Sequence, residues 1–196
     1  MLIDLHCHTL PRSQCSAIRP EEAVDLARAR GLDAICLTEH DRFWPEAELA
    51  SLGKRSAFPV FGGVELTTDL GHVLAFGLPP GRLPLATAAS AFAAAEAAGG
   101  VLFLAHPARD GLLRVTRETV AYFASVEAIN GSDSRLQNMA ATGLARGFRL
   151  PGLGGSDAHI PAEVGRAATR FPTPITDQAS LVAALRRGEY AAVNLE

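Results

Sequence analysis

The chain has 196 residues, 48% of them hydrophobic, so it can bury a sizeable core as one domain. Its net charge of −3 at pH 7 gives no signal for binding nucleic acid or a membrane surface, and no apolar run has the length of a bilayer span. The N-terminus lacks the features of a signal peptide, and the three cysteines lack metal-finger spacing. We therefore expect one cytoplasmic domain, residues 1–196, without a disulfide framework.

Strand-like and helix-like segments alternate in the first half of the chain. In chain order we expect strands at residues 2–5, 33–38, 58–66 and 72–78, and helices at residues 21–30 and 45–56. Pro20 and Gly31 bracket the first helix, which is the usual punctuation of a helix. Because so few residues separate the third strand from the fourth, we expect a hairpin between them rather than a helical crossover.

The second half repeats the alternation. We expect strands at residues 101–105, 126–130, 153–156, 168–171 and 190–195, and helices at residues 86–98, 116–123, 134–146 and 177–187. Alternating units of this kind favour a mostly parallel sheet with helices outside it. A complete eight-fold barrel needs about 250 residues, so the shorter chain predicts a distorted TIM-like (β/α)7 barrel.

Histidines mark the ends of the predicted strands. None of the six lies within a predicted helix: they are His6, His8, His40, His72, His106 and His159. In α/β barrels the carboxyl ends of the strands form the active face, and five of the six fall there directly. His72 begins its strand instead, but a hairpin would bring it beside Glu65 at the same rim.

Two motifs have the spacing of metal ligands. His6 and His8 are two residues apart on a strand, so both imidazoles point to one face. Asp157 and His159 repeat that spacing and pair an oxygen with a nitrogen, which suits Zn²⁺, Mn²⁺ or Fe²⁺. Glu65, at a strand end, offers a carboxylate that can bridge two ions.

Each motif also has an ordinary alternative. The first histidine pair could be unrelated surface residues, and Ser156 or Asp157 could cap a helix. His40, taken alone, is typical of a polar loop. One shared metal cluster explains all of these strand-end residues with a single cause, and we adopt that interpretation.

The motifs resemble those of the polymerase and histidinol phosphatase (PHP) superfamily. The similar segments occur in the same order: residues 4–9 (Asp-Leu-His-Cys-His-Thr), 38–41 (Thr-Glu-His-Asp), 63–65 (Gly-Val-Glu), 72–77 (His-Val-Leu-Ala-Phe-Gly), 105–107 (Ala-His-Pro) and 155–159 (Gly-Ser-Asp-Ala-His). The resemblance implies a distorted seven-stranded barrel that holds two or three divalent ions. It also implies hydrolysis of a phosphate monoester or diester by a metal-activated water, with a small-molecule phosphate ester or nucleotide as substrate.

The resemblance implies three ligand sets. The first ion would take His6, His8, Glu65 and Asp157, the second Glu65, His72 and His106, and the third His40 and His159. Many family members have an acidic ligand for the third site shortly after the first histidine pair, where residues 11–16 of this chain (Pro-Arg-Ser-Gln-Cys-Ser) contain no carboxylate. Either Cys15 substitutes as a thiolate, which favours Zn²⁺, or the third site is weak or empty. In the second case His40 or His159 could act as general acid.

Candidate substrate ligands lie on the same rim. A phosphoryl group favours a guanidinium partner, and Arg109, three residues after His106, is the first choice. Arg12 and Arg42 lie on other rim loops, although a solvated surface charge is the ordinary role of each. Asn130 ends a predicted strand and could bind substrate or orient another side chain.

Two other functions stay open. A barrel hydrolase of amide or cyclic carbon–nitrogen bonds also begins with a His-x-His pair, but its two-metal form uses a carboxylated lysine at a strand end. The only lysine, Lys54, falls in a predicted helix. A non-catalytic metal-binding module is the second alternative, and the missing acidic ligand is its best support. No hydrophobic stripe demands a partner protein.

Overall fold

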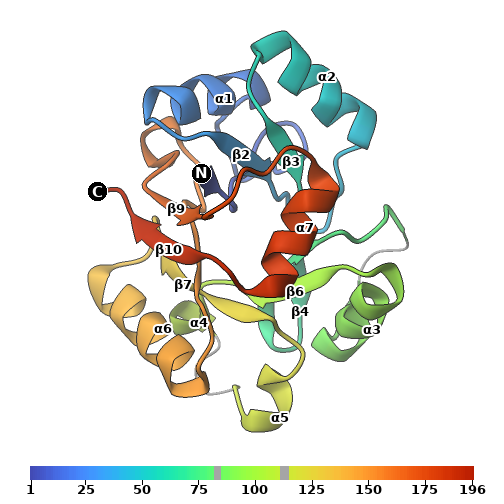
Figure 1. Cartoon of the computed structure of the whole chain (residues 1–196), viewed down its shortest axis with the longest axis vertical. Coiled ribbons are helices and arrows are strands. Elements are labelled where there is room, and N and C mark those ends of the chain that lie inside the picture. The colour runs from blue at the N-terminus through green and yellow to red at the C-terminus, as the bar shows by residue number, and fades with distance from the viewer. Residues whose placement is uncertain (82–84, 111–114) are drawn as a thin grey trace.

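The chain folds into a mixed α/β domain with two five-stranded sheets, seen in a computed structural model that describes residues 1–81, 85–110 and 115–196 (Figure 1). The first sheet has the order β10-β9-β1-β2-β3, with β1 Leu2–Asp4, β2 Ala34–Leu37, β3 Val60–Gly62, β9 Ala167–Arg170 and β10 Ala191–Asn194. The second has the order β4-β5-β6-β7-β8, with β4 Val64–Thr68, β5 Gly71–Phe76, β6 Val101–Leu104, β7 Ser125–Asn130 and β8 Leu153–Gly155.

Both sheets are mixed rather than mostly parallel. β1, β2 and β3 pair in parallel, as do β6, β7 and β8. The expected hairpin of β4 and β5 is present, and it pairs antiparallel with β6 as well. β9 and β10 are also antiparallel to their neighbours. A short connection explains the antiparallel pairing only for β4 and β5, because helical segments lie between β5 and β6 and between β9 and β10.

The strand expected at residues 58–66 is divided between the two sheets at Gly63. A side chain at Gly63 would lie 2.8 Å from the ring of Phe76 and 2.9 Å from Thr38, so the backbone passes there only because no Cβ is present. β3 therefore ends in the first sheet and β4 begins the second.

The expected barrel is not confirmed, because the two sheets are not closed into one ladder among the described residues. They approach each other through single parallel bridges, His40 with Glu65 and Cys7 with Ala158. On the same side as the Cys7–Ala158 bridge, where β8 faces β9, the Thr169 hydroxyl accepts from the Gly154 N–H at 2.9 Å and donates to its carbonyl at 2.8 Å. The bridges beside His40 and Cys7 bring the polar strand ends of both sheets together.

The helices cover the sheets from outside, except for the last one. The described helices are α1 Pro20–Ala29, α2 Glu46–Ser56, α3 Ala88–Ala98, α4 Pro107–Asp110, α5 Arg117–Val120, α6 Arg135–Phe148, α7 Gln178–Arg187 and the 3-10 helix η2 Pro161–Glu163. Figure 1 shows α7 lying across the strands near the centre of the view. Leu181 and Leu185 of α7 are fully buried in a core with Phe76 and Phe103, which joins both sheets into one domain.

Two helical features differ from expectation. The helix expected at residues 116–123 ends at Val120, because the chain must turn into β7 while burying Phe123. The short helix α4, which begins at Pro107, was not expected, although proline is favoured in the first turn. None of the helices in the described part of the chain has both the length and the apolar character needed to cross a bilayer.

Candidate metal centre

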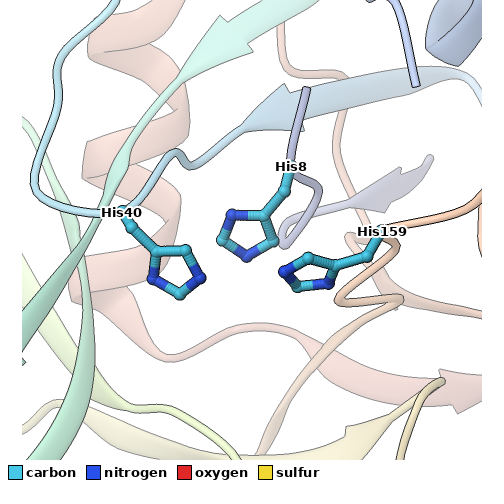
Figure 2. A group of neighbouring side chains, drawn as sticks. All are labelled: His8, His40 and His159. Atoms are coloured by element: carbon cyan, nitrogen blue, oxygen red, sulfur yellow. The ribbon is translucent and has the colours of Figure 1, made fainter. Parts of the chain in front are cut away.

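The six histidines meet at one end of the two sheets. His6 and His8 follow β1, His40 follows β2, His106 follows β6, and His159 follows β8, while His72 lies in β5. The His8 ring lies 4.4 Å from the ring of His40 and 4.3 Å from that of His159 between centroids. Figure 2 shows these three imidazoles side by side, each from a different part of the fold. The six histidines, which are distant from one another in the sequence, therefore lie close together in the fold.

Glu65 lies at the middle of this cluster and is completely buried. Its Oε1 is 3.0 Å from His72 Nδ1 and 2.9 Å from His106 Nε2. Its Oε2 is 3.1 Å from His8 Nε2 and from His40 Nδ1, and 3.3 Å from His6 Nε2. Each carboxylate oxygen thus faces a different set of imidazoles, which is the arrangement of a bridging ligand. Burial opposes its ionisation, but the nearby imidazoles hold the pKa of Glu65 well below its usual range.

Asp157 also turns its two oxygens to different neighbours. Oδ1 lies 3.3 Å from His8 Nε2 and 3.4 Å from His6 Nε2. Oδ2 accepts a hydrogen bond of 2.9 Å from the Arg109 guanidinium. The backbone of Asp157 has φ of 53°, an uncommon left-handed conformation that turns the carboxylate towards β1.

Three groups of side chains have donor atoms close enough to share an ion. Within each group the ligand atoms lie within 4.8 Å of one another, and the groups are His6, His8, Glu65 and Asp157; His40, Glu65 and His72; and His8, His40 and His159. The first contains two nitrogens and two carboxylates, whereas the third contains imidazoles alone. Such donor sets suit divalent transition ions.

The hydrogen bonds of His6 and His8 fit a cation in the first group. Glu127 Oε1 lies 2.9 Å from His6 Nδ1, and a carboxylate can only accept, so Nδ1 carries a proton, and in neutral His6 the other nitrogen, Nε2, presents a lone pair. Ser13 donates to Glu39, so its oxygen accepts from His8 Nδ1 at 3.3 Å. The two Nε2 atoms then face each other at 3.0 Å. Two lone pairs at this distance repel unless a cation lies beside them.

Electrostatics support the same conclusion. Burial disfavours a charged imidazole, but Asp157, Glu127 and Glu65 together raise the pKa of His6 well above its ordinary value. The buried Oε2 of Glu65 receives no well-aligned hydrogen bond from the described residues, although three imidazole nitrogens surround it. The cluster therefore needs positive charge, which either protons or metal ions can provide.

His40 and His159 lie at the mouth of the cluster, with about a third of each side chain exposed: 31% and 29%. Partial burial lowers the pKa of His40 to about 4, and burial together with the neighbouring His8 lowers the pKa of His159. Both imidazoles are neutral at pH 7 in this environment, so they can bind a cation or accept a proton.

Three acidic residues to which the sequence reasoning assigned no role hold this cluster in place. Glu127 in β7 contacts His6, and Glu39 accepts hydrogen bonds from the Ser13 hydroxyl and from the Trp44 indole. Asp4 accepts from the backbone N–H groups of His6, Ser156 and Gly165. A glutamate inside the buried strand Ser-Val-Glu-Ala-Ile-Asn was the available signal for Glu127, because buried charges are rare without a partner.

The two nearest substrate candidates are engaged with the cluster. Arg109 makes ion pairs with Asp157 at 2.9 Å and Asp133 at 2.7 Å, and it donates to Asn130 Oδ1 at 3.2 Å. Asn130 is completely buried, and its Nδ2 donates to Glu127 at 2.9 Å. The geometry of Asn130 therefore favours the orienting role over substrate contact, while Arg109 keeps a third of its side chain exposed.

The remaining candidates lie further out. Arg12 stacks on the Trp44 ring at 4.3 Å and pairs with Glu48 at 2.8 Å, and Arg42 is exposed. Cys15 is exposed and belongs to none of the three metal-ligand groups found among the described residues. Burial and the nearby carboxylates raise the pKa of Cys15, which disfavours the thiolate. Lys54 lies in a helix, α2, as expected from the sequence, and its side chain is exposed.

Comparisons with known proteins agree with this geometry. A family model described as the PHP domain matches residues 4–126, and one described as PHP-associated matches residues 135–190. The chain is 35% identical over 88 residues to the 3',5'-nucleoside bisphosphate phosphatase of Chromobacterium violaceum, and the match covers 43% of this chain and 30% of that relative. The chain thus spans less than a third of that relative's length.

Solved structures share the fold. Superposition on PsfC from Pseudomonas syringae gives a TM-score of 0.72 with 20% identity, covering 98% of this chain and 91% of that one. An amidohydrolase from Chromobacterium violaceum, solved with bound sulfate and no metal, gives 0.68 with 20% identity and covers 99% and 98%. At this identity the likeness concerns the fold alone.

Proposed function

The chain belongs to the PHP domain family, and from that premise we propose that it is a metal-dependent phosphoesterase acting on a small-molecule phosphate ester. The observation that carries the proposal is Glu65, a buried carboxylate whose two oxygens face separate sets of imidazole nitrogens. A carboxylate of this kind can hold two ions close together. In two-metal phosphoesterases, such a pair of ions stabilises both the attacking oxygen and the leaving oxygen. We propose further that residues 1–196 act as one catalytic unit.

The candidate ligands form two sets that should bind an ion tightly and a third set that should bind one weakly. We assign His6, His8, Glu65 and Asp157 to the first ion, and Glu65, His72 and His106 to the second. His40 and His159 remain for a third, where His8 completes a group of three imidazoles. That third set lacks a carboxylate, so we expect two tightly held ions and a weaker third. Mixed nitrogen and oxygen donors favour Zn²⁺, Mn²⁺ or Fe²⁺.

The protein's own residues prepare the site for a phosphate ester. Bound divalent ions supply Lewis acidity that lowers the pKa of water and neutralises phosphoryl charge. Arg109 fixes Asp157 and leaves part of its guanidinium exposed for a phosphoryl oxygen. His40 and His159, at the mouth of the cluster, can exchange a proton with the leaving oxygen when no third ion occupies them.

The relative named as a nucleoside bisphosphate phosphatase supports phosphate monoesters of nucleotides as the first substrates to test. The amidohydrolase-type alternative has less support, because its bridging lysine has no counterpart near the cluster: Lys54 lies exposed on α2. A non-catalytic metal-binding module is the other alternative, and only turnover distinguishes it from an enzyme.

The test is hydrolysis by purified protein loaded in turn with Zn²⁺, Mn²⁺ and Fe²⁺. The substrates are p-nitrophenyl phosphate, its bis ester, a nucleoside bisphosphate and a cyclic amide. We expect turnover of phosphate esters that His6→Ala and Asp157→Ala abolish. Asp25→Ala is the matched control, because Asp25 is an exposed carboxylate on α1. Metal binding without turnover of any ester would favour the regulatory module, and turnover of the amide alone would favour the amidohydrolase.

A further inference from the structure

We propose that Glu127 is the positioning residue that sets the tautomer of His6 and the backbone of His106, an inference that rests on the metal-centre function proposed above. Glu127 lies in β7 and is completely buried. Oε1 lies 2.9 Å from His6 Nδ1. Oε2 accepts from the backbone N–H of His106 at 2.8 Å and from Asn130 Nδ2 at 2.9 Å. One carboxylate therefore contacts residues assigned to two different ions.

The contact with His6 decides which ring nitrogen faces the cluster as a lone pair. A carboxylate accepts hydrogen bonds and donates none, so the proton of neutral His6 sits on Nδ1. Nε2 is then deprotonated, and it lies 3.3 Å from Glu65 and 3.4 Å from Asp157. Carboxylate–histidine pairs of this kind orient metal-binding imidazoles and raise their basicity.

The contact with His106 holds an unusual backbone. His106 has φ of 25°, outside the regions that non-glycine residues normally adopt, which costs on the order of 1–3 kcal/mol. The hydrogen bond from its N–H to Glu127 is one of the contacts that maintain this conformation. In it, His106 Nε2 lies 2.9 Å from Oε1 of Glu65, the carboxylate that would bridge the two proposed ions. Glu127 thus couples the end of β1 to the end of β6.

Glutamine cannot replace this carboxylate, although it has almost the same shape. With its amide oxygen towards His6, the NH₂ group would face two donors, the His106 N–H and Asn130 Nδ2. In the opposite orientation, the NH₂ group would face His6 Nδ1 and force His6 to accept there. The proton of His6 would then move to Nε2, where the ion must bind. Both orientations therefore weaken the metal centre.

The experiment compares Glu127→Gln with the wild-type full chain. Affinity for Zn²⁺ is measured by competition with a chelator, and the visible spectrum of the Co²⁺-loaded protein reports ligand geometry. We expect binding weaker by about 10–100-fold and a changed Co²⁺ spectrum. Glu96→Gln is the control, because Glu96 is exposed on α3. Thermal unfolding of each metal-free protein separates a general loss of fold from a specific loss of affinity.

Affinity of Glu127→Gln within twofold of the wild type, with an unchanged Co²⁺ spectrum, would overturn the inference. A second measurement needs no variant: the ¹⁵N spectrum of the metal-loaded wild type must show His6 protonated at Nδ1, and protonation at Nε2 would also overturn it. Wild-type protein that binds metal but hydrolyses no ester would refute the proposed function while this inference is still judged by its own result.

Discussion

Replacing Gly155 with alanine tests whether the close packing of β8 against His6 positions the metal centre. A Cβ at Gly155 would lie 2.8 Å from His6 N and even nearer His6 Cβ, and 3.2 Å from Glu127 Oε1. Restoring ordinary contact at 3.4 Å from 2.8 Å requires at least about 0.6 Å of movement at His6 N, and more at His6 Cβ. The neighbours are backbone and Cβ atoms, which cannot rotate away, so His6 itself must shift.

Two effects follow from this displacement. Overpacking of a buried site costs about 1–3 kcal/mol, which we expect as a lower free energy of unfolding for metal-free Gly155→Ala in urea. Ligand geometry tolerates about 0.5 Å, so the same shift weakens metal binding and lowers turnover, by up to about 100-fold. Chelator competition and ester hydrolysis measure these losses.

Gly143→Ala is the matched control, because it makes the same chemical change at an exposed position of α6 with nothing within 4 Å of the new Cβ. Alanine in a helix is favoured over glycine by about 0.5–1 kcal/mol, so this variant should be slightly more stable and bind metal as the wild type does. Gly155→Ala with wild-type unfolding energy and metal affinity would refute the packing argument.

Three further predictions concern other parts of the fold. Arg109→Ala removes the ion pairs of Asp133 and Asp157, and urea unfolding should lose about 1–3 kcal/mol because the Asp133 carboxylate stays buried; an unchanged midpoint would contradict this. Phe103→Ala opens a cavity in the core between the sheets and should cost about 3–5 kcal/mol in the same assay, and a loss below about 1 kcal/mol would argue against that core. Burial raises the pKa of Tyr190, so the unfolded chain loses its phenolic proton at lower pH than the folded chain does, and the free energy of unfolding of the wild type should fall as pH rises above about 10. Tyr190→Phe should show a smaller fall, and an equal dependence of the unfolding free energy on pH in both proteins would exclude the effect.

The sequence predicted elements better than it predicted their arrangement. The helix expected at residues 45–56 is α2, Glu46–Ser56, and the one expected at 177–187 is α7, Gln178–Arg187, because proline, aspartate and glycine mark their ends locally. The division at Gly63 and the antiparallel pairing of β9 depend on contacts between distant strands. Apolar periodicity carries no information about which neighbour a strand pairs with.

For the candidate site, the sequence indicated the candidate metal ligands, but it did not indicate the buried acids that position those ligands. Histidines and acids at strand ends stand out in the sequence, and the structure brings His6, Glu65, His106 and Asp157 together. Glu127 and Asp4 lie within strands, where only the unusual burial of a charge distinguishes them. Their partners come from elsewhere in the chain, so no local pattern identifies them.

The buried acids around the site fall into two classes, and the difference explains why the fold needs a cation there. Asp4, Glu39 and Glu127 are each satisfied by hydrogen bonds from the protein, which makes their burial tolerable. Glu65 and Asp157 instead turn oxygens towards the Nε2 atoms of His6 and His8. Because Glu127 and Ser13 engage the Nδ1 atoms, neutral imidazoles have no Nε2 proton to donate. Glu127, and Glu39 through Ser13, therefore leave the oxygens of Glu65 and Asp157 facing Nε2 lone pairs, and a divalent ion supplies the missing positive charge without disturbing either tautomer.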